Sequence, residues 1–112
     1  MNFQVTKPGL EMGVLSLLRK GDMYGYEIIA AISDVARITA GSVYPMLKAM
    51  KQEGLVETYL EDAQTGAPRK YYRTTEAGLR RCQELQDEWI NFITAMFTMM
   101  RMNSYKYERS ES

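Results

Sequence analysis

The chain has 112 residues, 14 basic against 14 acidic side chains and a hydrophobic fraction of 46%, which predicts one compact globular unit. No stretch is apolar enough to cross a bilayer, and residues 1–8 lack the features of a secretory signal, so we expect a cytoplasmic protein without a membrane partner. The absence of histidine and the single cysteine, Cys82, exclude an internal disulfide, Ser-His and Cys-His catalytic pairs, and nearly every imidazole or thiolate metal site. We therefore predict no enzymatic activity, no metal and no cofactor.

Three amphipathic helices are predicted in the first half of the chain. The first helix has an apolar stripe at Leu10, Val14, Leu17 and Leu18. The second has one at Tyr24, Ile28, Ile29 and Ile32, and the third at Val43, Leu47 and Met50. Gly21 ends the first helix, the second ends within residues 34–37, and Gly54 closes the third. Either Thr39 or Ser42 can cap the third helix; we favour Thr39, although it places Pro45 deeper in the helix.

The second half of the chain predicts a β-hairpin and a long helix. Residues 55–61 and 69–74 favour strands, and residues 62–68 favour a turn between them. Thr75 caps a helix with an apolar seam in steps of three and four residues: Cys82, Leu85, Trp89, Phe92, Met96 and Met99. Flanking apolar residues widen the seam: Ile90, Ile93, Phe97 and Met100. We expect this helix to pack on the first helix and on a second copy of itself.

The order of these elements is typical of a winged helix-turn-helix followed by a dimerisation helix. The predicted fold class is mainly α with a small β-hairpin. We assign residues 1–74 to a DNA-binding domain, residues 75–102 to the dimerisation helix and residues 103–112 to a polar tail.

Several motifs, in their order and spacing, resemble the PadR family of bacterial transcriptional regulators, specifically the short subgroup with one C-terminal helix. They are Leu10-Glu11 with Leu15 to Leu18, Gly-Asp-Met-Tyr-Gly-Tyr-Glu-Ile at 21–28, Ile-Thr-Ala-Gly-Ser-Val-Tyr-Pro-Met-Leu at 38–47, Glu-Gly-Leu-Val at 53–56, Pro-Arg-Lys-Tyr-Tyr-Arg at 68–73 and Thr-Glu-Ala-Gly at 75–78. The resemblance implies a homodimer that binds a palindromic operator in double-stranded DNA. It also implies a repressor that a small phenolic or hydrophobic effector releases.

The resemblance, together with the surface position of these side chains, predicts a set of DNA-binding residues: Tyr24, Tyr26, Thr39, Ser42, Tyr44, Lys48, Lys51, Arg69, Lys70 and Arg73. Tyr44, Lys48 and Lys51 lie opposite the apolar stripe of the third helix, where a recognition helix meets the major groove. The basic residues of the hairpin, Arg69, Lys70 and Arg73, are expected to contact phosphates or a minor groove. The alternative is an edge strand whose charges prevent aggregation. Of Tyr24 and Tyr26 we expect one, not both, to touch DNA, the alternative being partial burial in the core.

The predicted dimer interface consists of Leu79, Cys82, Leu85, Trp89, Phe92, Ile93, Met96 and Met99. The predicted effector-binding residues are Trp89, Phe92, Ile93 and Met96, whose aromatic, aliphatic and thioether side chains suit a flat apolar ligand at the dimer interface. The resemblance supports this prediction, because drug-responsive relatives place a tryptophan at a similar distance after Thr-Glu-x-Gly. Plain interface core is the alternative for Trp89. For the whole protein, the neutral net charge keeps open a winged-helix module that binds another protein and not DNA.

Overall fold

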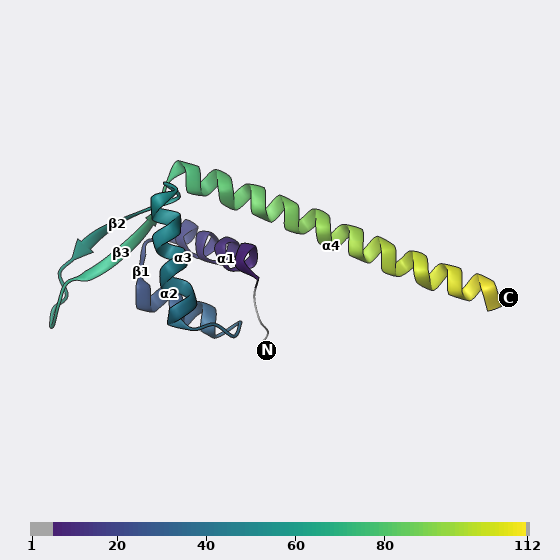
Figure 1. Cartoon of the computed structure of the whole chain (residues 1–112), viewed down its shortest axis with the longest axis horizontal. Coiled ribbons are helices and arrows are strands. Elements are labelled where there is room, and N and C mark those ends of the chain that lie inside the picture. Colours follow the sequence, from purple (N-terminus) through teal and green to yellow (C-terminus); the bar gives the residue numbers. More distant parts are fainter. Residues whose placement is uncertain (1–5, 112) are drawn as a thin grey trace.

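The computed structural model describes the backbone of residues 6–111 and the side chains of residues 6–102. The elements are α1 (Lys7–Lys20), β1 (Met23–Tyr24), α2 (Gly25–Ser33), α3 (Ala40–Gln52), β2 (Val56–Glu61), β3 (Arg69–Thr74) and α4 (Glu76–Glu111). Helices α1 to α3 and the small sheet form one body, and α4 starts at this body and extends far beyond it (Figure 1). The predicted fold class, mainly α with a small β-hairpin, is confirmed.

The first helix begins and packs as its sequence predicts. Thr6 Oγ1 accepts a hydrogen bond from the Gly9 amide at 3.3 Å, and Pro8 occupies the first turn, where its missing N–H costs nothing. Leu10, Val14 and Leu18 are buried as expected. Leu17 is only half-buried, and the fully buried neighbour is Leu15.

Helix α3 begins after Thr39, which confirms the favoured cap over Ser42. The amides of Ser42 and Val43 donate to the Thr39 carbonyl at 3.0 and 3.2 Å. Pro45 therefore lies inside the helix and removes one backbone hydrogen bond. Burial of Val43, Leu47 and the other apolar residues of this face holds the helix in place.

The sheet has three strands, so the predicted two-stranded hairpin is incomplete. Strand β1 pairs antiparallel with β3, and the order is β1-β3-β2. Strand β1 was missed because two residues are too few to show the period-two pattern of a strand. The sequence placed Tyr24 inside the second helix instead. The Tyr24 amide donates instead to Glu27 Oε1 at 3.1 Å, and α2 starts at Gly25. We call residues 56–74, which comprise β2, β3 and their turn, the wing.

The body and α4 share one core. Cys82 and Leu85, near the start of α4, are buried against α1, as the predicted packing of the long helix on the first helix requires. Beyond Leu85 most apolar side chains of α4 are exposed up to Met102. Residues 103–111, expected as a polar tail, continue the helical backbone of α4. Among the described residues, no helix is both long and apolar enough to span a membrane.

Candidate nucleic-acid interface

Helix α3 presents an exposed polar face directly opposite its buried one. Tyr44, Lys48 and Lys51 are exposed, and their spacing places them on one side of the helix. Thr39 and Ser42 are exposed at its N-terminal end. Because the opposite face is fixed in the core, these five predicted side chains share a rigid support that can enter a DNA groove.

Tyr44 also packs against the start of α2. Its ring lies against the main chain of Gly25, at the first position of α2, so closely that a Cβ at position 25 would overlap the ring. A side chain at position 25 would therefore displace the Tyr44 ring. Tyr44 nevertheless remains 47% exposed.

The two faces of the wing carry different basic residues. Tyr72 is buried beneath the sheet, and alternation places Lys70 on the same face at the exposed end of the hairpin. Arg69 and Arg73 lie on the other, outer face with Tyr71. Neither Arg69 nor Lys70 forms an ion pair with any residue that the structure describes. Both cations are thus available to a phosphate.

A row of three tyrosines crosses the outer face of the sheet. Tyr24, Tyr71 and Tyr59 are cross-strand neighbours in the register of β1, β3 and β2. The ring centroids of Tyr24 and Tyr59 each lie 5.6 Å from that of Tyr71. The guanidinium of Arg69 covers the Tyr24 ring at 4.7 Å, and that of Arg73 covers the Tyr59 ring at 4.8 Å. This arrangement half-buries Tyr24, while Tyr26 remains 68% exposed.

Arg73 has carboxylate partners within the chain. Its Nε donates to Asp22 Oδ2 at 3.2 Å, and its Nη1 lies 3.9 Å from Glu57 Oε1. Asp22 Oδ2 also accepts a hydrogen bond from Tyr59 Oη at 2.7 Å. This hydrogen bond raises the pKa of Tyr59, because the phenol proton is held by a carboxylate, and the bond from Arg73 raises the pKa of that guanidinium. Sequence reasoning grouped Arg73 with Arg69 and Lys70 and missed Asp22.

The first turn of α4 is bonded to the chain segment that leaves α3. The Thr75 amide donates to the Leu55 carbonyl at 3.1 Å, and Thr75 Oγ1 donates to the Gly54 carbonyl at 2.6 Å. The Gly78 amide donates to Thr75 Oγ1 at 3.0 Å, which confirms Thr75 as the helix cap. Arg81 Nε donates to Glu11 Oε1 at 2.9 Å and links α4 to α1. Helix α4 therefore continues the body of α1 to α3 and the sheet without a flexible joint.

Two of the predicted dimer-interface residues are buried in the core of the single chain. Cys82 has no exposed surface and Leu85 is 5% exposed, because α1 covers this side of α4. Cys82 Sγ lies 3.6 Å from both Ser16 Oγ and Gln86 Nε2. The remaining predicted residues are exposed or half-buried, namely Leu79, Trp89, Phe92, Ile93, Met96 and Met99.

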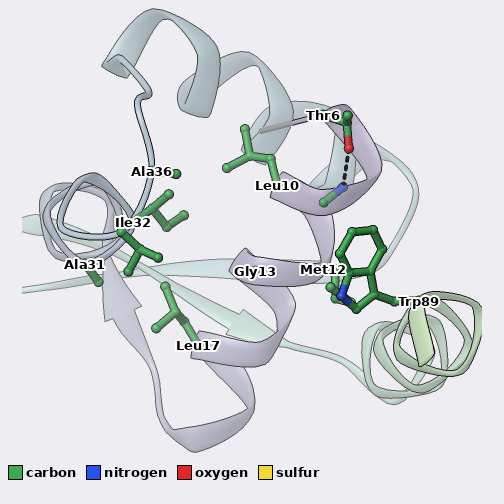
Figure 2. A pocket seen from close by; sticks show the side chains of 11 residues that line it. Thr6, Leu10, Met12, Gly13, Leu17, Ala31, Ile32, Ala36 and Trp89 are labelled. Atoms are coloured by element: carbon green, nitrogen blue, oxygen red, sulfur yellow. Dashed lines mark hydrogen bonds between the residues drawn. The ribbon is translucent and has the colours of Figure 1, made fainter. Parts of the chain in front are cut away.

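An apolar cavity of about 570 Å³ lies between α1, the end of α2 and Trp89 of α4 (Figure 2). Leu10, Leu17 and Ile32 form much of its wall, and Thr6, Gly9, Met12, Gly13, Ala31, Val35 and Ala36 complete it. A smaller cavity of about 250 Å³ shares Trp89 and adds Phe92. Ile93 and Met96, also predicted to bind an effector, line neither cavity. The sequence analysis did not predict that α1 and α2 form walls of this cavity. The small residues Gly9, Gly13 and Ala31 were the available signal, because small side chains leave space between two helices.

Known proteins resemble this chain over most of its length. Residues 14–84 match the family described as "Transcriptional regulator PadR-like family". An uncharacterized protein of Lysinibacillus sphaericus is 33% identical over 84 residues, which cover 71% of this chain and 77% of that protein.

Solved structures agree with this match. A Streptococcus mutans UA159 protein has a TM-score of 0.83 at 31% identity, covering 90% of this chain and 94% of its own. A PadR family transcription regulator from Clostridium difficile R20291 has a TM-score of 0.75 at 29% identity, covering 81% of this chain and 97% of its own. A PadR-like transcriptional regulator from Bacillus cereus ATCC 14579 has a TM-score of 0.74 at 30% identity, covering 81% and 90%. This chain belongs to the PadR-like family of transcriptional regulators, and it is a DNA-binding regulator and not an enzyme.

Proposed function

We propose that the protein is a homodimeric repressor that binds a palindromic operator and is released by a small hydrophobic or phenolic effector. The observation that carries the proposal is the exposed face of α3, where Tyr44, Lys48 and Lys51 stand on a helix whose other face is buried. Side chains of this kind donate hydrogen bonds to base edges and phosphates in the major groove. Thr39 and Ser42 add hydroxyl groups at the end of the same helix.

The wing and the start of α2 supply contacts to the DNA backbone in this proposal. Arg69 and Lys70 lie at the exposed end of the hairpin with no ion-pair partner among the described residues. Tyr26 is the better placed of the two tyrosines, because Tyr24 is covered by Arg69 and Tyr71. Arg73 was expected to bind phosphate, but its carboxylate partners favour a role inside the protein.

A second copy of the chain is the proposed partner of α4. Trp89, Phe92, Met96 and Met99 are exposed on the single chain, and Ile90, Phe97 and Met100 are exposed beside them. An apolar surface of this length is unfavourable in water and typical of a helix that pairs with another. Two paired α4 helices would place two α3 helices on one DNA duplex, as an inverted repeat requires.

The cavity beside Trp89 suits the proposed effector. Its walls are apolar, apart from Thr6, and a volume of about 570 Å³ matches that of small-molecule sites. The indole of Trp89, which offers a flat surface for an aromatic ring, connects this cavity with α4 (Figure 2). A ligand that moves Trp89 would move α4, and the bonds of Thr75 would pass the movement to the segment after α3.

A gel shift with the promoter region beside the protein's own gene, at two salt concentrations, tests the proposal. We expect a specific complex that persists at the higher salt, with weaker binding to random DNA of equal length. Lys48→Ala should weaken the complex, whereas Arg101→Ala, which removes the same charge from the distant part of α4, should not. No binding to promoter or random DNA at either salt would favour the winged-helix module that binds a protein.

A further inference from the structure

The side chain of Asp22 contacts both strands of the wing. It follows Gly21 at the end of α1 and precedes β1, so it belongs to the body and not to the hairpin. Its Oδ2 atom accepts one hydrogen bond from Tyr59 Oη on β2 at 2.7 Å and another from Arg73 Nε on β3 at 3.2 Å. These contacts join residues that are 37 and 51 positions apart in the sequence.

On the inner face of the sheet, Val56 and Tyr72 attach the base of the wing to the core. On the outer face the wing has few attachments. Strand β1 pairs with β3 over two residues only, Met23 with Tyr72 and Tyr24 with Tyr71. A two-residue ladder limits the bend of a projecting hairpin weakly, because so few hydrogen bonds oppose it. The carboxylate of Asp22 adds a further attachment on the outer face, to Arg73 on β3 and to Tyr59 on β2, the strand farthest from β1.

The Arg73 guanidinium completes this attachment. It covers the Tyr59 ring at 4.8 Å while its Nε donates to Asp22, so the arginine holds the ring whose hydroxyl bonds the same carboxylate. Tyr59 stacks in turn on Tyr71, the middle ring of the row that ends at Tyr24. One acidic oxygen therefore fixes the end of a continuous layer of rings and guanidinium groups.

We propose that Asp22 is a positioning residue for DNA binding, which sets the angle of the wing through Tyr59 and Arg73 without touching DNA. This inference rests on the proposed function. Lys70, at the end of the wing, and Lys48, on α3, must reach the same duplex at once, so the angle of the wing determines whether both contacts form. Replacement of Asp22 then removes contacts between the wing and DNA, although every side chain that contacts DNA is still present.

Hydrogen exchange of the protein without DNA gives the first test. Asp22→Ala and Tyr59→Phe should both accelerate amide exchange in residues 56–74, and the double variant should add little, since both remove the same bond. Asp22→Asn keeps an oxygen that accepts from Tyr59 and should stay near the wild type. Asp87→Ala is the matched control, because it removes one carboxylate from the side of α4 opposite to Trp89.

DNA titration at several salt concentrations gives the second test. Asp22→Ala should weaken operator binding about tenfold and make the salt slope shallower by about one unit, as one lost phosphate contact would. Tyr59→Phe should follow it, and Asp22→Asn should restore most of the affinity. If Asp22→Ala instead strengthens binding to all DNA and steepens the slope, Asp22 merely withholds Arg73 from phosphate, and the proposal is wrong.

Failure of the proposed function and failure of the positioning role give different results. If the wild-type protein binds no DNA, the proposed function fails, while exchange in the wing still reports whether Asp22 holds it. If the wild type binds its operator and Asp22→Ala changes neither exchange nor affinity, the positioning role is refuted and the proposed function stands.

Discussion

Gly78, in the first turn of α4, lies directly against the main-chain carbonyl of Leu55, and a Cβ at position 78 would overlap that oxygen. The same carbonyl accepts hydrogen bonds from the Thr75 amide and hydroxyl, both at 3.1 Å. Leu55 follows the turn at Gly54 that closes α3. Helix α4 is therefore bonded to the segment that directly follows α3, which links α4 to the helix that we propose binds DNA.

Two glycine-to-alanine substitutions should have opposite effects on stability. Gly78→Ala should lower the free energy of unfolding by about 1–3 kcal/mol, because the backbone of Leu55 cannot move aside cheaply. Gly13→Ala, inside α1 where an added Cβ meets no atom within 4 Å, should raise it by about 0.5–1 kcal/mol. Urea denaturation followed by circular dichroism measures both. A stabilised Gly78→Ala variant would show that α4 does not begin tightly against Leu55.

The recognition face of α3 should determine sequence specificity. Lys48→Ala should weaken operator binding by about 1–3 kcal/mol and binding to random DNA by less, since contacts to base edges exist only on the operator. Lys48 suits this test better than Tyr44, because truncation of Tyr44 also removes its packing on Gly25. Fluorescence anisotropy with both DNAs measures the ratio. Equal losses of affinity for both DNAs would mean that α3 contacts only the DNA backbone.

The two basic residues at the end of the wing, Arg69 and Lys70, should behave differently from Arg73. Arg69→Ala combined with Lys70→Ala should weaken binding to all sequences alike and make the salt slope shallower by about one unit for each lost phosphate contact. Arg73→Ala should also lower affinity, but with faster amide exchange in the wing before DNA is added, because it loses Asp22 and Tyr59. An unchanged slope in the double variant would mean that the end of the wing faces away from DNA.

Sequence periodicity predicted the helices and the hairpin well because these elements follow local patterns of apolar residues. It failed where a side chain's partner is distant in the sequence. Cys82 and Leu85 fit the seam as well as Trp89 does, but periodicity cannot tell that α1 covers the first two and leaves the third exposed. Asp22 is another such case, because nothing in its own segment indicates two partners on the wing.

Helix α4 should hold the proposed dimer together through residues beyond Leu85. Light scattering should give twice the mass of the chain at micromolar concentration. Phe97→Glu combined with Met100→Glu should yield a folded monomer, because two exposed apolar residues become charged without altering the core around Cys82. Arg101→Glu is the control for added negative charge on the same helix. A dimer that survives the double substitution would place the interface elsewhere.

Effector binding should be measurable through Trp89, the only tryptophan of the chain. A planar hydrophobic or phenolic compound should quench its fluorescence and release operator DNA. In the proposed mechanism a ligand beside Trp89 would displace α4, which is bonded to the segment that leaves α3. The coupling between ligand and DNA is expected to be about 1–3 kcal/mol and must be reciprocal, so operator DNA should lower ligand affinity by the same factor.

Trp89→Ala should weaken ligand binding, whereas Ile93→Ala, outside both cavities, should change it little. If a compound releases DNA from the Trp89→Ala variant with undiminished affinity, its site lies elsewhere and Trp89 is ordinary interface core. If Ile93→Ala weakens binding as much as Trp89→Ala does, the ligand lies between the paired α4 helices and not in the cavity bounded by α1.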